Sequence, residues 1–293
     1  MPPSAPWTRA APVLFLLLWS LGFPVAKIGI EAVDPLLFLA LRFALVLIVL
    51  LPVALWLRPP LPTRGSDWGH QIMVGALIQT LYFGLCYTGF ALGASAATVA
   101  LIISLQPILV ALLAPRLLGE HIDARHWLGL ALGLAGAALV ILSGEAHGGG
   151  SLAGLVCALG ALLGISAATL YEKRFGSTLH PVTANAIQYA TGLITTLPLV
   201  LLFGQYRLVW SVEMVASLGY LVIGNSLIAL TLLLAMIRRG AASQVSALFY
   251  LIPPTAALMA WLLIDEPLPA MGWVGMAVAA LGVVLASRGK TTR

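Results

Sequence analysis

Long apolar stretches alternate along this chain with short breaks that carry charged residues, proline or glycine. A helix needs roughly 20 apolar residues to cross the hydrocarbon core of a bilayer. Ten stretches come close to that length, so the pattern predicts an all-helical membrane protein with ten spans and no soluble domain. The predicted spans cover residues 11–31, 36–57, 70–91, 94–115, 124–143, 151–172, 181–203, 212–237, 241–264 and 269–287.

Composition supports the same class, and the placement of charge predicts the orientation. Hydrophobic residues make up 61% of the chain and charged residues 9%, which is far from the average of soluble domains. The breaks on one predicted side hold almost all the loop lysines and arginines, and the other side holds only Arg207. Cytoplasmic loops carry the excess of positive charge, so both termini are expected in the cytoplasm, with no nucleic acid as a partner.

The chain also contains an internal repeat. Residues 95–141 and 241–287 align without a gap at a constant spacing of 146. The scarce residues that coincide are Pro107 with Pro253, Glu120 with Glu266 and Trp127 with Trp273. This predicts two five-span repeats, residues 1–147 and 148–293. Because five is odd, the second repeat enters the membrane from the opposite side, and such inverted repeats are typical of transporters that work by alternating access.

Three segments resemble the drug/metabolite transporter superfamily, and within it the ten-helix EamA-type exporters. They are WSLGFPVAKIGIE from Trp19 to Glu31, PLLFLALRF from Pro35 to Phe43, and the stretch from Ala94 to Glu120 that ends in LLGE. The overall pattern is most similar to bacterial exporters of aromatic amino acids and metabolites. The resemblance implies that spans three, four, eight and nine, with one and six, surround a central cavity, while spans five and ten pack at the periphery.

Spans five and ten are rich in glycine and carry no polar side chain at depth, which agrees with a peripheral role. Small residues at helical spacing let two helices approach closely. Packing within the monomer is favoured over dimerisation, so we expect a monomer, with an oligomer as the open alternative.

Polar side chains inside the cavity-lining spans are the candidates for substrate contact, because a polar group at depth tends to face the bundle interior. For serine and threonine the alternative is a hydrogen bond to their own helix. Amides are harder to explain that way, since each has four hydrogen-bonding sites to satisfy. The candidates are Gln79, Tyr82, Thr98, Ser104, Gln106, Tyr171, Asn225, Gln244, Ser246 and Tyr250.

Trp19 lies near mid-depth of the first span, where its ring could stack on an aromatic or apolar substrate or serve only as packing. Lys27 and Arg42 are the two formal cations within spans. They could attract a substrate carboxylate. The favoured alternative is a structural pair with Glu31 or Asp34, or snorkelling of the side chains to the membrane surface.

Four prolines are candidate hinges: Pro24, Pro107, Pro253 and Pro254. A proline inside a helix removes a backbone hydrogen bond and bends the helix. Pro107 and Pro253 occupy equivalent positions of the two repeats, and transporter sites often gather at such paired interruptions. A static bend is the alternative reading.

These patterns predict an inner-membrane transporter that exports small molecules, apolar or aromatic amino acids and related metabolites, through a cavity between its halves. The chain shows no HExxH motif, no Walker A run and no carboxylate deep in a span, so no cofactor, metal or enzymatic activity is expected. The alternatives are efflux of amphipathic or cationic compounds, and, in a different class, a channel or a membrane scaffold without transport.

Overall fold

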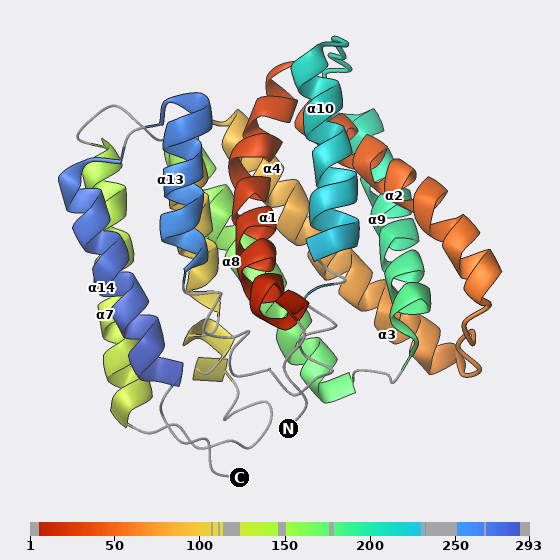
Figure 1. Cartoon of the computed structure of the whole chain (residues 1–293), viewed down its shortest axis with the longest axis horizontal. Coiled ribbons are helices and arrows are strands. Elements are labelled where there is room, and N and C mark those ends of the chain that lie inside the picture. The colour runs from red at the N-terminus through yellow and green to blue at the C-terminus, as the bar shows by residue number, and fades with distance from the viewer. Residues whose placement is uncertain are drawn as a thin grey trace.

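The computed structural model describes residues 6–106, 108–110, 112–113, 124–145, 151–175, 179–229, 232, 251–266 and 268–287. The described residues form helices joined by short connections (Figure 1). In chain order the elements are α1 (Pro6–Glu31), α2 (Pro35–Leu57), α3 (Gly65–Gly75), η1 (Ala76–Tyr82), α4 (Phe83–Ala91), α5 (Ala96–Ser104), α7 (Ala124–Glu145), α8 (Leu152–Phe175), α9 (Pro181–Phe203), α10 (Val212–Tyr220), η2 (Leu221–Ala229), α13 (Ile252–Ile264) and α14 (Ala270–Ser287).

Six helical segments are long and apolar enough to cross a membrane, which makes the chain a multi-pass membrane protein. They are 10–31, 35–57, 65–91, 152–172, 181–203 and 212–229. Shorter apolar helices lie within the predicted fourth, fifth, ninth and tenth spans. The count of ten spans stays a prediction.

The sequence at the start of α2 explains why the helix begins there. Asp34 precedes the helix, and its Oδ1 accepts hydrogen bonds from the backbone N–H groups of Leu36 and Leu37 at 3.0 and 3.1 Å. Pro35 follows at the first helical position, where its missing N–H costs no intrahelical bond. The helix ends at Arg58, which takes a left-handed conformation with φ 46°.

The helices recur at the spacing found in the repeat. α2 begins at Pro35 and α9 at Pro181, which are 146 residues apart, and each helix carries an internal proline at the same relative place, Pro52 and Pro198. The first residues of α1 and α8, and those of α7 and α14, are also 146 apart. The regularity therefore extends beyond the aligned segment into the first half of each repeat.

α7 and α14 pack against each other at one edge of the bundle (Figure 1). The approach is close enough to require glycine. A Cβ added at Gly136 would lie 2.4 Å from the backbone nitrogen of Ala279, and one at Gly282 would lie 2.5 Å from the nitrogen of Gly133. These glycines thus serve contact between two helices of the same chain.

Two helices contain a wider π-helical stretch, and the two stretches match. η1 joins α3 to α4 within one continuous helix from Gly65 to Ala91. η2 follows α10 directly. Residues 76–82 of η1 shifted by 146 become 222–228, which lie inside η2. π-helical turns are rare and often mark functional sites.

Candidate functional site

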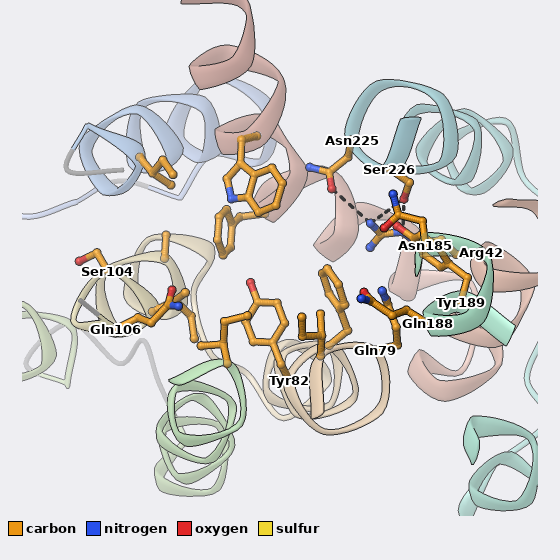
Figure 2. A pocket seen from close by; sticks show the side chains of 18 residues that line it. Arg42, Gln79, Tyr82, Ser104, Gln106, Asn185, Gln188, Tyr189, Asn225 and Ser226 are labelled. Atoms are coloured by element: carbon orange, nitrogen blue, oxygen red, sulfur yellow. Dashed lines mark hydrogen bonds between the residues drawn. The ribbon is translucent and has the colours of Figure 1, made fainter. Parts of the chain in front are cut away.

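A cavity of about 250 Å³ lies inside the bundle, between elements of the two halves of the chain. Eighteen residues line it, and they come from α1, α2, η1, α4, α5, the residues after α5, α8, α9, η2 and α13 (Figure 2). The lining residues are Trp19, Phe23, Arg42, Ile78, Gln79, Tyr82, Phe83, Ala100, Ile103, Ser104, Gln106, Ile165, Asn185, Gln188, Tyr189, Asn225, Ser226 and Ile252.

Arg42 supplies the formal charge of this lining, and it is 1% exposed. Its Nη1 donates to Tyr87 Oη at 2.9 Å, and its Nη2 donates to Asn225 Oδ1 at 3.2 Å and to Ser226 Oγ at 3.0 Å. The guanidinium also lies 4.7 Å from the centre of the Phe83 ring. Every hydrogen-bonding partner of Arg42 among the described residues is neutral, so no carboxylate there balances its charge.

The rest of the lining is largely aromatic and aliphatic. Tyr82 and Phe83 follow each other at the junction of η1 and α4, with their ring centres 4.7 Å apart. Trp19 and Phe23 lie four residues apart on α1 and line the same cavity. Aromatic rings can pack on a flat or apolar ligand, so the cavity combines one cation with an apolar surface.

The lining residues themselves follow the spacing of 146. Both members of four equivalent pairs line the cavity: Trp19 with Ile165, Arg42 with Gln188, Gln79 with Asn225, and Gln106 with Ile252. Equivalent surfaces of the two halves therefore face one shared cavity. The two surfaces differ in chemistry, however, because Arg42 of the first half is matched by the amide Gln188 in the second.

The structure brings six of the proposed substrate residues together around the cavity: Trp19, Gln79, Tyr82, Ser104, Gln106 and Asn225. Ser104 also forms a hydrogen bond to its own helix, which was the alternative expected for serine, because its Oγ donates to Leu101 O at 2.6 Å. Gln106 donates through Nε2 to Thr169 Oγ1 at 2.7 Å.

Two proposed substrate residues lie elsewhere. Thr98 is in the first turn of α5, where Ser95 Oγ accepts from its backbone N–H at 3.0 Å as a helix cap. Tyr171 hydrogen-bonds through its hydroxyl to His70 Nδ1 at 2.9 Å and is absent from the cavity lining. Gln244, Ser246, Tyr250 and Pro107 lie outside the described residues.

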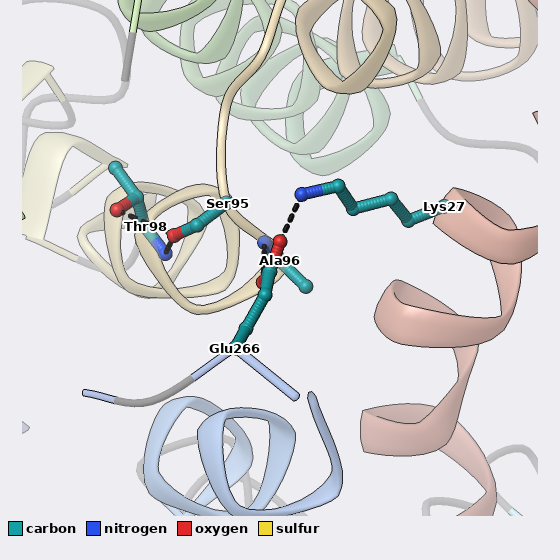
Figure 3. Close-up of polar contacts among 5 residues, drawn as sticks. All are labelled: Lys27, Ser95, Ala96, Thr98 and Glu266. Atoms are coloured by element: carbon teal, nitrogen blue, oxygen red, sulfur yellow. Dashed lines mark hydrogen bonds and ion pairs between the residues drawn. The ribbon is translucent and has the colours of Figure 1, made fainter. Parts of the chain in front are cut away.

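Lys27 and Arg42 do not form the structural pairs that the sequence favoured. Lys27 forms an ion pair with Glu266, which follows α13 (Figure 3). Glu266 also accepts a hydrogen bond from the backbone N–H of Ala96 at 3.0 Å. Asp34 instead caps α2 and accepts from Gln205 N at 3.0 Å. The prediction missed this pair because its members are far apart in the sequence and meet only where α13 packs on α1.

The proline predictions also need a correction. α13 begins at Ile252, so Pro253 and Pro254 fall in its first turn rather than inside a helix. Backbone N–H groups in the first turn have no intrahelical partner, so these prolines remove no hydrogen bond of α13. Pro24 is buried inside α1, which runs on to Glu31, and its role as a hinge stays a prediction.

α2 and α9 also line the cavity, although the resemblance implied neither span there; Arg42 of α2 was a candidate from the sequence, and the residues of α9 were not. α9 contributes Asn185, Gln188 and Tyr189, and α2 contributes Arg42. A signal was present in the sequence. The segment PVTANAIQY places two amides in an apolar span, and it stands 146 residues after PLLFLALRF.

The described residues contain no group of three or more histidine, cysteine, aspartate or glutamate side chains that could hold a metal. The cavity lining offers hydrogen-bonding groups, one guanidinium and apolar surface. Such a lining suits reversible binding of a small molecule.

Comparison with known proteins identifies the family. The model of the EamA-like transporter family matches residues 10–142 and again residues 152–288. A protein of known crystal structure has the same fold, with a TM-score of 0.62 and 22% identity over 97% of both chains.

Named relatives cover nearly the whole chain. An uncharacterized transporter of Bacillus subtilis is 25% identical, covering 96% of this chain and 92% of the relative. A protein of Streptantibioticus cattleyicolor named "Probable terminal-alkyne amino-acid exporter" is 27% identical, covering 94% and 92%. A protein of Escherichia coli K12 named "Probable amino-acid metabolite efflux pump" is 22% identical, covering 93% and 92%. With both halves of the chain matched, this protein is a membrane transporter of the EamA-like transporter family.

Proposed function

We propose that this transporter exports amino acids with apolar or aromatic side chains, and related small metabolites, across the inner membrane. In this proposal residues 1–147 and 148–293 are two inverted repeats, with both termini in the cytoplasm. The single observation that carries the substrate class is the composition of the cavity, one buried guanidinium beside an aromatic and aliphatic lining.

The buried charge of Arg42 favours a substrate that brings a carboxylate. A charge inside a protein is costly to leave unpaired, and its partners among the described residues are neutral. A guanidinium has five N–H donors and binds carboxylates with two parallel hydrogen bonds. Nη1 carries two N–H groups and has one partner among the described residues, Tyr87 Oη, which leaves a donor for a ligand.

The aromatic residues favour an apolar substrate side chain. Trp19, Phe23 and Tyr82 line the cavity that also holds Arg42. Contact between aromatic rings adds about 0.5–1.5 kcal/mol beyond the burial of apolar area. Two relatives bear names that refer to amino-acid export, in agreement with this class.

Alternating access is supported by the matched halves. α2 contacts α9 and α7 contacts α14, so two pairs of equivalent helices from the two halves pack against each other. Two similar halves that exchange their packing would open the cavity to one side and then to the other. With both termini cytoplasmic, the end of α1 with Lys27 faces the outside.

The test is counterflow in liposomes that contain the purified protein. Unlabelled phenylalanine inside should drive accumulation of labelled phenylalanine from outside, and Trp19→Ala should reduce the rate. Flux without counterflow would instead indicate a channel, and no flux would indicate a scaffold. Counterflow of cationic dyes but of no amino acid would refute the proposed substrate class in favour of drug efflux.

A further inference from the structure

Gln79 is a buried amide whose side-chain oxygen has no hydrogen-bond partner among the described residues. The residue is 4% exposed, and it lines the cavity. It stands in the middle of η1, on the same side of the cavity as Arg42 and Gln188 (Figure 2). An unsatisfied acceptor in an apolar protein interior is unfavourable, so a ligand that brings a donor would gain from meeting it.

The repeat explains why this acceptor lacks a donor. Asn225 is the equivalent of Gln79, and its Oδ1 accepts from Nη2 of Arg42. The equivalent of Arg42 in the other half is Gln188, whose Nε2 donates to Gln71 Oε1 at 2.9 Å. Asn225 of the second half thus has a cationic donor from the first half, whereas its equivalent Gln79 has no donor from the second half among the described residues.

We infer that the ammonium group of the substrate takes the place of the missing cation at Gln79, while its carboxylate binds Arg42. The inference rests on the proposed function and sharpens it, because it requires a zwitterion. Gln79 and Arg42 lie on the same side of the cavity in Figure 2, and Ser104 and Gln106 lie on the other. The substrate side chain then extends from the pair of polar contacts into the apolar part of the cavity.

Gln79 is then a specificity-determining residue that recognises the amino group of the substrate and not its carboxylate. Three competitors of similar shape separate the two contacts: phenylalanine, phenylpropionate, which lacks the ammonium, and phenethylamine, which lacks the carboxylate. Each is added to the counterflow assay with labelled phenylalanine. In the wild type, phenylalanine should compete at least tenfold better than either analogue, as expected for one hydrogen bond to a charged group.

The decisive variant is Gln79→Leu, which keeps the size of the side chain and removes the acceptor. It should weaken competition by phenylalanine about tenfold and leave competition by phenylpropionate unchanged. Gln79→Glu keeps an acceptor and adds negative charge, so phenethylamine should compete more strongly in this variant than in the wild type. The matched control is Thr196→Val, because Thr196 is also fully buried, its hydroxyl has no hydrogen-bond partner among the described residues, and it does not line the cavity.

The outcomes separate this inference from the proposed function. Equal weakening of phenylalanine and phenylpropionate in Gln79→Leu, with no gain for phenethylamine in Gln79→Glu, would overturn the inference and leave amino-acid export intact. Wild-type protein that exchanges no amino acid would refute both. A variant that fails to fold is recognised by its thermal unfolding in detergent, and the Gln79→Glu arm then decides.

Discussion

The ion pair between Lys27 and Glu266 connects the two halves of the transporter. Lys27 belongs to α1, and Glu266 follows α13 and also accepts from Ala96 N at the start of α5. The two side chains are 23% and 19% exposed, so the pair lies between a surface pair and a buried one. Removing Lys27 should therefore weaken the contact between α1 and the segment after α13.

The size of the effect follows from that partial burial. Exposed ion pairs contribute about 0–1 kcal/mol, whereas removal of one partner from a buried pair costs about 3–5 kcal/mol. For Lys27→Met we expect a loss of about 2 kcal/mol, which corresponds to a change of roughly 30-fold in an equilibrium constant. If the pair forms only while the cavity is closed to the outside, the whole change shifts the population toward the outward-open state.

The assay is the rate at which a membrane-impermeant maleimide, added from outside, modifies a cysteine in the cavity. Ser104→Cys supplies the reporter, in a background where Cys86 and Cys157 are replaced by alanine. Lys27→Met should raise the modification rate by about tenfold or more, whereas Lys27→Arg, which keeps the charge, should change it little. An unchanged rate together with a lowered melting temperature would show that the pair stabilises the fold and takes no part in opening.

Three further outcomes follow from the structure. Gly136→Ala should cost about 1–3 kcal/mol of unfolding free energy, because its Cβ would meet Ala279 N at 2.4 Å, while Gly84→Ala, with no neighbour within 4 Å, should leave the melting temperature unchanged. Arg42→Lys keeps the charge but loses the planar guanidinium, so it should raise the half-saturating phenylalanine concentration in counterflow about tenfold. An unchanged concentration would show that Arg42 only packs. Trp19→Ala should weaken phenylalanine exchange more than alanine exchange, and equal weakening of both would contradict stacking.

Hydropathy located several helices closely and missed features that depend on packing. The predicted span 36–57 differs from α2 by one residue at its start, because Asp34 and Pro35 are strong local signals. The third predicted span began at residue 70, whereas the helix begins at Gly65. That first turn is polar, so an apolar criterion could not include it.

The candidate site was predictable to the extent that polar residues in spans face inward. That rule found Gln79 and Asn225, but it gave no sign that Arg42 would have neutral partners, since Ser226 and Asn225 reach it from the other half of the chain. The π-helical stretches were also invisible. A seven-residue stretch changes the hydrophobic pattern too little to be separated from an α-helix by periodicity.

The matching π-helical stretches also bear on the history of the molecule. A π-turn arises when a helix accommodates an extra residue, and such changes are individually rare. η1 and η2 occupy equivalent places in the two halves, so a single event before the halves were joined is a simpler origin than two separate events. The ancestral half then already carried the irregular turn, and the cavity formed where that half met a second copy of itself. The two halves have since diverged at the cavity, because Arg42 of one half is matched by Gln188 in the other, so a site built from two related halves is chemically asymmetric.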